Sequence, residues 1–336
     1  MTDYEMICQE SRNLSAEEQA RVLQYIQQIQ NKNSGGKAER EKPEHCPRCG
    51  GSSVIRFGHK RGKQRFCCKD CGGVFMVSSG TIMENSHYDE EIWSEAVADT
   101  LDGFVSLDET AQRLGMSHDA AFHMRHKILM SMEAREKASP TQLGGISELD
   151  ETYVLESLKG RKFPENASRE PRNHGEKATQ RGISNEQICI MTGVERNGGS
   201  AYAVTLNRAH PSAGEIKTAF QGHIETGCVA FTDGLKGYGH LEEIADCVIE
   251  SVDRQEQKNA GTANLNNVNN FHSYIHERYS HYRGVAIQYI NRYNSLFSTV
   301  YRAKESFSHV ADAILHSISA HVFSCWDVHH TALVII

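Results

Sequence analysis

The sequence predicts a mixed α/β protein in which cysteine-rich and helical segments precede a sheet. Two C-x-x-C pairs lie within residues 46–71, and residues 106–130 have helical apolar spacing around a central glycine. From residue 145 onward, short apolar runs of strand length alternate with helical segments. Together these patterns predict an α/β catalytic core behind smaller binding modules.

The composition is that of a globular protein large enough for several domains. The chain has 336 residues, of which 39% are hydrophobic and 24% charged. It lacks an apolar run of the roughly 18–20 residues that span a bilayer, and its first residues lack the order of a secretory signal. We therefore expect a cytoplasmic protein without a membrane partner, whose clustered cysteines bind metal rather than form disulfides.

The charge is unevenly distributed. A net charge of −7 argues against a protein that coats nucleic acid indiscriminately. Ten basic residues nevertheless lie between Lys37 and Lys69 against three acidic ones, Glu39, Glu41 and Glu44. Ahead of this basic segment, residues 1–36 are assigned to an N-terminal helix and linker, because Ser15 and Glu18 form a capping-box pattern at the start of an amphipathic stretch.

A zinc ribbon is predicted over residues 37–80. Its expected ligands are two C-x-x-C pairs separated by 18 residues, namely Cys46, Cys49, Cys68 and Cys71. Cys68 is preferred to Cys67 because it alone leaves the two-residue gap. Thiol redox chemistry is the alternative, but it needs only one such pair. The basic residues between the pairs either form a solvated face or contact DNA phosphates; the DNA-binding candidates are Arg56, Lys60, Arg61, Lys63 and Arg65.

Residues 81–140 are assigned to a helix-turn-helix region. A first helix is expected around Glu109 to Leu114, then a turn at Gly115, then a second helix from Ser117. A plain helical hairpin has the same apolar spacing, but the basic second helix favours groove recognition. Its displayed residues are expected to be His123, Arg125, His126 and Lys127, with Arg125 and Lys127 as DNA-binding candidates.

The segment 141–302 is assigned to the catalytic core, and 303–336 to a helical tail of unread role. Strands are expected at 145–156, 186–195, 200–207, 228–234 and 245–251, with helices at 212–224 and 265–279. Three strands in a meander, then helix, strand, short helix, strand and helix, is the order of an RNase H-like core. In such a sheet Asp150 and Asp233 lie side by side.

Two neighbouring aspartates are suited to divalent metal chemistry. Close carboxylates tolerate both charges chiefly when a cation shares them, and Mg²⁺ prefers oxygen ligands. Two such ions can activate a hydroxyl and stabilise a departing 3′ oxygen of DNA. The amide of Asn269, on the helix at 265–279, is a weaker third ligand. Taken singly, Asp150 can simply end a strand and Asp233 can be a turn residue.

Three blocks of sequence resemble a known family. They are E-L-D-E-T-Y-V-L-E-S-L-K-G (148–160), T-D-G-L-K-G-Y (232–238) and N-N-F-H-S-Y-I-H with Y-R-G-V (269–285). These blocks resemble the zinc-ribbon insertion-sequence transposases of the ISXO-like group, insertion-sequence family fifteen-ninety-five. With the ribbon and helix-turn-helix, the resemblance spans roughly residues 15–300.

The resemblance implies a DDE-type transposase with Asn in place of the third acid. Asp150, Asp233 and Asn269 match the three metal-binding catalytic positions, with Mg²⁺ or Mn²⁺ as cofactor beside the structural Zn²⁺. Asn-containing members carry a Lys seven residues further on, where this chain has His276, which is only partly protonated near neutral pH, so its contact with phosphate is expected to be weaker and pH-dependent. Glu151 is expected to be a surface residue, and Glu148 is left without a role.

Further DNA contacts are expected beside the catalytic core. The long loop from Ser157 to Ser184 is basic, with Lys159 and Arg161 as candidates, and is either a disordered insertion or a DNA-ordered arm. Arg283 is a third candidate; His281 and Tyr282 beside it can also touch DNA, or Tyr282 can belong to the core.

The function expected from these features is that of a transposase. It would bind the terminal inverted repeats of its own element, cut the DNA and join the 3′ hydroxyl to target DNA, as a homo-oligomer associated with the nucleoid. The alternative is a catalytically weak, zinc-dependent DNA-binding regulator, motivated by Asn269 and His276. A general nuclease is a third possibility.

Overall fold

The computed structural model describes residues 42–60, 62–159, 178–197, 199–252, 263–303 and 307–316. The helix expected at 14–31 and the candidates Arg61 and Arg161 lie outside these residues. The chain divides into two compact units between Val77 and Ser78. Each unit is built around its own hydrophobic cluster or clusters.

The first unit is a small antiparallel sheet in the order β1-β2-β3. Its strands are β1 (Val54–Lys60), β2 (Lys63–Cys68) and β3 (Val74–Phe75). Its buried apolar cluster consists of Cys46, Val54, Phe66, Cys68 and Phe75. So small a core cannot stabilise a fold by hydrophobic burial alone, so a further cross-link is needed.

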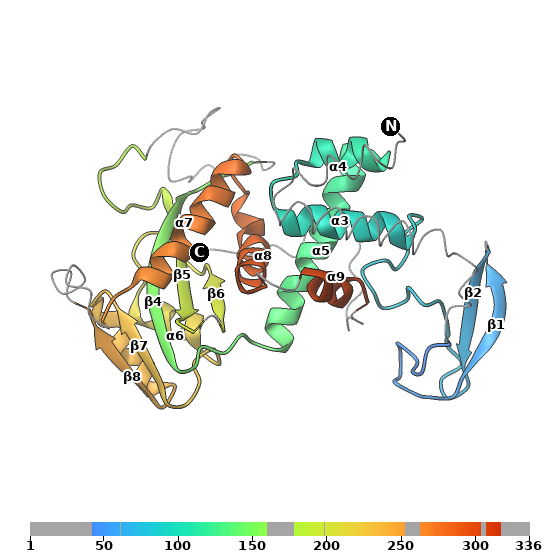
Figure 1. Ribbon diagram of the computed structural model, residues 1–336, viewed down its shortest axis with the longest axis horizontal. Coiled ribbons are helices and arrows are strands. Elements are labelled where there is room, and N and C mark those ends of the chain that lie inside the picture. The colour runs from blue at the N-terminus through green and yellow to red at the C-terminus, as the bar shows by residue number, and fades with distance from the viewer. Residues whose placement is uncertain are drawn as a thin grey trace, which may run out of the picture. The chain divides into compact units, whose positions relative to one another are not determined.

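The second unit contains a five-stranded sheet in the order β6-β5-β4-β7-β8 (Figure 1). The strands are β4 (Ile146–Leu155), β5 (Gln187–Glu195), β6 (Ala201–Val204), β7 (Cys228–Thr232) and β8 (Cys247–Ser251). β4, β5 and β6 form an antiparallel meander, whereas β7 pairs in parallel with both β4 and β8. The predicted RNase H-like core is confirmed, although β6 is shorter than expected.

Helices cover both faces of this sheet. One face packs against α7 (Asn266–His281), and α8 (Ile290–Arg302) lies against β6. The opposite face packs against α6 (Ala213–Phe220) and the 3₁₀ helix η1 (Lys236–Glu243). Strand residues alternate between the two cores, so Ile190 and Val194 belong to the first and Cys189 and Met191 to the second.

Three helices precede the sheet in the same unit. They are α3 (Glu90–Asp102), α4 (Leu107–Leu114) and α5 (His118–Ala138). Ser106 and Glu109 form a capping box at α4, Gly115 ends α4 in the left-handed conformation with φ +64°, and Ser117 caps α5. The predicted helix-turn-helix boundaries are therefore confirmed.

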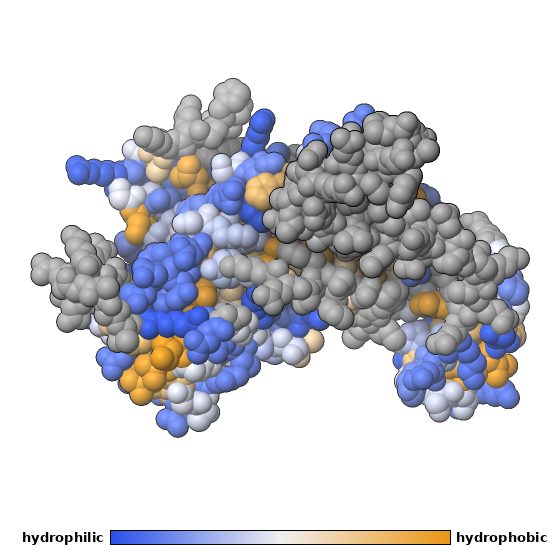
Figure 2. All heavy atoms as spheres, in the orientation of Figure 1, coloured by the Kyte–Doolittle hydropathy of each residue, from blue (hydrophilic) through white to orange (hydrophobic). Residues whose placement is uncertain are grey.

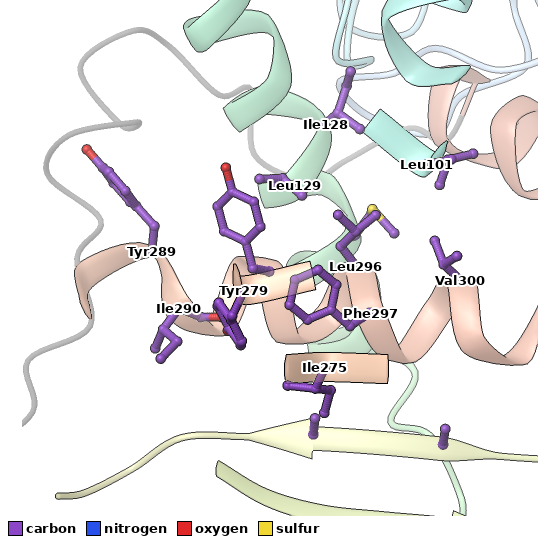
Figure 3. Packing of buried hydrophobic residues seen from close by; sticks show 14 of the residues in the cluster. Leu101, Ile128, Leu129, Ile275, Tyr279, Tyr289, Ile290, Leu296, Phe297 and Val300 are labelled. Atoms are coloured by element: carbon purple, nitrogen blue, oxygen red, sulfur yellow. The ribbon is translucent and has the colours of Figure 1, made fainter. Parts of the chain in front are cut away.

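The main core joins these helices to α7 and α8. Figure 3 shows Leu101 of α3, Ile128 and Leu129 of α5, Ile275 of α7 and Leu296 of α8 within one cluster. α9 (Phe307–His316), in the predicted helical tail, adds Ile314 and Leu315. Among the described residues, no helix combines the length and apolar character needed to cross a membrane.

Apolar side chains are also exposed at one edge of the sheet. Figure 2 shows them gathered where Figure 1 draws β7 and β8, and Val248 of β8 is 50% exposed. The opposite edge strand, β6, is covered by α8.

Packing of Ile275 should dominate the stability of α7. Ile275 is fully buried, so Ile275→Ala should lower the free energy of unfolding by about 2–5 kcal/mol through lost burial and a cavity. Urea denaturation measures this loss. Ser280→Ala, on the exposed side of the same helix, is the control and should change stability by less than about 0.5 kcal/mol. Equal effects of the two variants would contradict this packing.

Candidate functional site

The four predicted zinc ligands come together in the first unit. One sulfur of each of Cys46, Cys49, Cys68 and Cys71 lies within 4.8 Å of all the others. The Sγ–Sγ distances are 3.8 Å between Cys46 and Cys71 and 3.7 Å between Cys49 and Cys68. A tetrahedral zinc ion with bonds of about 2.3 Å separates its sulfurs by roughly 3.8 Å. The four thiols therefore fit Zn²⁺.

The choice between the adjacent cysteines is also settled. Cys68 is buried within the cluster, whereas the Sγ of Cys67 lies 3.7 Å from the carbonyl oxygen of Cys68 and belongs to no cluster. The preference for Cys68, made on spacing, is confirmed.

The hairpin of the ribbon exposes its basic residues. Along β1 only Val54 is buried, so Arg56 and Lys60 are at the surface, as is Lys63 on β2. Arg65 is half-buried, with its guanidinium 5.5 Å from the centre of the Phe57 ring. These positions are compatible with the predicted DNA contacts, which remain predictions.

The predicted display of basic residues on the second helix-turn-helix helix is wrong. Arg125 is 5% exposed and donates from Nη2 to the carbonyl oxygen of Val105 at 2.8 Å. His126 is 1% exposed and lies 3.1 Å from Nη1 of Arg292, a residue of α8. Lys127 donates to the carbonyl oxygen of Glu84 at 3.2 Å and lies over the Trp93 ring.

The reason is that α5 is a core helix. It packs against α3, α4 and α8, so Arg125 and His126 point inward and are satisfied by a carbonyl group and a neighbouring side chain, whereas polar residues at its two ends, such as His118 and Lys137, are exposed. His123 is half-buried. Arg125 and Lys127 are therefore positioned to hold the helices together rather than to enter a DNA groove.

Asp150 and Asp233 converge as predicted. β4 and β7 run parallel with Glu148 opposite Phe231, which places the residues two further along, Asp150 and Asp233, next to one another. One carboxylate oxygen of each lies within 4.8 Å of the other and of an oxygen of Glu151. Asp233 follows β7 directly, and its Oδ1 accepts a hydrogen bond from the Leu235 N–H at 3.1 Å.

Glu151 is not the surface residue that was expected. It is half-buried, because Tyr238 of η1 packs over this side of the sheet and donates from its hydroxyl to Glu151 Oε2 at 3.1 Å. Burial, together with the charge of Asp233, raises the pKa of the Glu151 carboxyl. Three crowded carboxylates of this kind have the oxygen chemistry that a hard divalent cation requires.

Two histidines of α7 lie against the strands beside this cluster. His272 Nδ1 is 3.9 Å from Asp150 Oδ2, and its Nε2 is 2.7 Å from the hydroxyl of Thr192. His276 Nε2 is 2.7 Å from the hydroxyl of Thr152. His272 is half-buried, and desolvation of its ring, with the charge of His276, lowers its pKa to about 4, so it is neutral at pH 7. His276 is exposed, and partial desolvation of its ring lowers its pKa, which weakens its predicted phosphate contact.

Asn269 is exposed on α7, one helical turn before His272 and two turns before His276. It precedes His272 by three residues, so the two share a face of α7, and its carbonyl oxygen accepts a hydrogen bond from Ser273 Oγ at 3.1 Å. Its service as third metal ligand remains a prediction. Sequence reasoning missed His272, whose Nδ1 lies 3.9 Å from Asp150 Oδ2.

Glu148, left open from the sequence, anchors the start of α7. Its side chain is fully buried, and Oε2 accepts hydrogen bonds from the N–H groups of Asn267 and Val268 at 2.8 and 3.0 Å. Its Oε1 accepts from Asn267 Nδ2 at 2.8 Å and from Arg196 Nε at 2.7 Å. The N-cap residue Leu265 offers no side-chain acceptor, so Glu148 satisfies the N–H groups of Asn267 and Val268, while Asn264 Oδ1 accepts from that of Asn266.

The remaining basic candidates lie where two segments meet. Lys159 and Arg283 are both exposed, and Arg283 adopts φ +51° just after α7. The N–H of Ile287 donates to the carbonyl oxygen of Ser157 at 3.1 Å, so the chain after β4 contacts the chain after α7. Tyr282 packs against the main core instead of facing DNA.

A sheet of this order, with carboxylates at the adjoining ends of its two central parallel strands, defines an RNase H-like domain. Comparison with known proteins is more specific. Residues 142–303 match the family described as the ISXO2-like transposase domain.

Individual relatives are more distant. The chain is 26% identical over 200 residues to an uncharacterized protein in transposable element ISH50 of Halobacterium salinarum. That match covers 59% of this chain and 65% of the relative, which is less than two thirds of its length. Crystal structures of a pre-cleavage Mos1 transpososome and of the Mos1 strand transfer complex give TM-scores of 0.25 and 0.27 at 9% and 10% identity. Each covers 70% of this chain, and 80% and 79% of the respective solved chains, a similarity too low to carry an argument.

Zinc binding should distinguish the two adjacent cysteines. Cys68→Ser removes one of the four thiolates and should lower the zinc content of the purified protein and unfold the ribbon, because the fold of so small a unit depends on its metal. Cys67→Ser is the matched control and should retain the zinc content of the unaltered protein. Elemental analysis measures both. Zinc loss in Cys67→Ser but not in Cys68→Ser would contradict the assignment.

Replacing Glu148 should destabilise the second unit strongly. Glu148→Gln leaves Arg196 without its buried carboxylate and turns an amide N–H₂ toward other donors, at a cost of about 3–5 kcal/mol. Chemical denaturation gives the value. Glu277→Gln, an exposed carboxylate on α7, the helix that Glu148 anchors, should be nearly neutral. A cost below about 1 kcal/mol for Glu148→Gln would show that the buried network contributes little.

Proposed function

We propose that this protein is a DNA transposase that binds the ends of its mobile element and catalyses metal-dependent cleavage and strand transfer. The observation that carries the proposal is the convergence of Asp150 and Asp233 at the ends of adjacent parallel strands, in a domain of the transposase family. The whole-protein activity extends beyond the matched domain and is inferred from its chemistry.

Asp150 and Asp233 would hold the catalytic Mg²⁺ or Mn²⁺, with the Asn269 amide as a weaker ligand from α7. Such ions, when bound, activate a hydroxyl nucleophile and stabilise the departing 3′ oxygen. The strands fix the two aspartates, and Glu148 fixes the helix that carries Asn269. The two aspartates thus come from rigid elements, as precise positioning of a phosphodiester requires.

DNA would be held by basic residues outside the cluster. Arg56, Lys60 and Lys63 of the ribbon and Lys159 and Arg283 beside the core are exposed and suited to phosphate contacts. Two element ends must be held together for strand transfer, so the active form is proposed to be a homo-oligomer that also engages target DNA.

A catalytically weak DNA-binding regulator is the second candidate. Its motivation is that Asn269 brings no charge and that burial lowers the pKa of His276, which leaves α7 without an acid or a cation at these two positions. This candidate shares the zinc ribbon and the DNA contacts but not the cleavage.

Cleavage of labelled element-end DNA in Mg²⁺ or Mn²⁺ tests the proposal. Asp150→Asn and Asp233→Asn should each lower the cleavage rate at least about a hundredfold, more than the 10–100-fold typical of outer-shell metal partners, because a ligand charge is lost. Binding of the DNA, measured by mobility shift, should persist. Asp246→Asn, at an exposed position away from the cluster, is the control and should cleave normally.

The other outcomes separate the alternatives. Binding without cleavage in either metal by the unaltered protein would support the regulator. Cutting of unrelated DNA at similar rates would support a general nuclease.

A further inference from the structure

The acidic cluster of Asp150, Glu151 and Asp233 contains side chains from both faces of the sheet. Asp150 and Glu151 are consecutive on β4, so their side chains leave the strand on opposite sides. Asp150 faces α7, where it meets His272, and Glu151 faces η1, where it meets Tyr238. β7 ends at Thr232, and Asp233 follows it within reach of both carboxylates.

The spacing of the three oxygens is close to that of a shared ion. They lie within 4.8 Å of one another. Oxygens around one octahedral Mg²⁺, at about 2.1 Å from the ion, are roughly 3–4 Å apart. A small inward movement of flexible carboxylates would therefore complete the shell.

The hydrogen bonds of Glu151 leave room for a metal. Each carboxylate oxygen can accept more than one bond. Oε2 accepts from the Tyr238 hydroxyl at 3.1 Å, and Oε1 accepts from the Tyr153 hydroxyl at a longer 3.4 Å. These hydroxyl groups orient the carboxylate while leaving lone pairs on both oxygens.

The number of negative charges in the site is a reason to expect the Glu151 carboxylate to bind metal. Asp150, Asp233 and Asn269 supply only two negative charges toward two divalent ions. A ligand set with a third acid supplies three negative charges. Glu151 restores this third charge from the opposite face of the sheet.

We propose that Glu151 is a direct ligand of the catalytic divalent metal, and that it supplies the carboxylate that Asn269 lacks. The inference rests on the proposed function, because it concerns the same metal site. It assigns to this chain a set of three carboxylates, two of them consecutive on one strand.

Mn²⁺ binding to the full zinc-loaded chain tests this assignment without DNA or catalysis. Free Mn²⁺ is titrated by electron paramagnetic resonance; Mn²⁺ does not displace Zn²⁺ from thiolates, for which it has far lower affinity. Glu151→Gln keeps the size of the side chain and an acceptor for a tyrosine hydroxyl, yet removes the charge. It should weaken Mn²⁺ binding at least about tenfold.

Three further variants make the result specific. Asp246→Asn, at an exposed position just before β8 and at the end of that strand remote from Asp233, also removes one negative charge and should leave the affinity within about twofold. Asp150→Asn should abolish tight binding. Glu151→Asp, which keeps the charge one methylene further back, should fall between the unaltered protein and Glu151→Gln, and it covers the case in which Glu151→Gln does not fold.

These variants distinguish a failure of the role proposed for Glu151 from a failure of the proposed transposase function. Equal affinities of Glu151→Gln and Asp246→Asn, with loss of binding in Asp150→Asn, would overturn the role of Glu151 and leave the metal site intact. An unaltered protein that binds no Mn²⁺, or an Asp150→Asn variant that binds it normally, would overturn the proposed function as well.

Discussion

The buried carboxylate of Glu148 at the first turn of α7 is the constraint on which the candidate site depends. α7 is joined to β4 by no short connection, since more than a hundred residues separate Glu148 from Asn267. N–H groups of its first turn nevertheless donate hydrogen bonds to Glu148 of β4. Arg196, just after β5, neutralises the same carboxylate. Because a helix N-terminus is electropositive and its donors unpaired, this one side chain satisfies both needs. The start of α7 is thereby held at Glu148, which lies two residues before Asp150 on β4.

One strand organises both faces of the site. Glu148, Asp150 and Thr152 point toward α7, where they meet its first turn, His272 and His276 respectively. Leu149 and Glu151 point the other way, toward Phe220 and Tyr238 of the second core. Alternation along β4 thus assigns helix anchoring, core packing and the proposed metal site to the successive residues Glu148, Leu149 and Asp150. A shift of register by one residue would exchange all of these roles at once, so the extensive pairing with β5 protects the site.

The features that could be predicted from the sequence are those that follow from local periodicity and residue spacing. The strand order, the convergence of Asp150 with Asp233 and the preference for Cys68 all depend on patterns that a chain displays directly. Arg125 and Glu151 were misjudged because their positions depend on distant partners: α8 encloses α5, and Tyr238 covers Glu151. A charged residue on a helix or strand is normally solvated, and only the tertiary arrangement reveals the exception. Glu148 had a usable signal, since it shares the Asp150 face of the strand, but its partner Arg196 could not be identified from spacing.

The balance of charge around the cluster favours a cation as its missing component. Arg196, the guanidinium beside the start of α7, is engaged by Glu148 and by the Asn264 carbonyl oxygen. His272 carries little positive charge near neutral pH, because burial disfavours its protonated form. The side of α7 nearest Asp150 therefore brings hydrogen bonding but little compensating charge. Carboxylates held together by strand geometry repel, and bound Mg²⁺ or Mn²⁺ relieves that repulsion while supplying the charge that a phosphodiester needs.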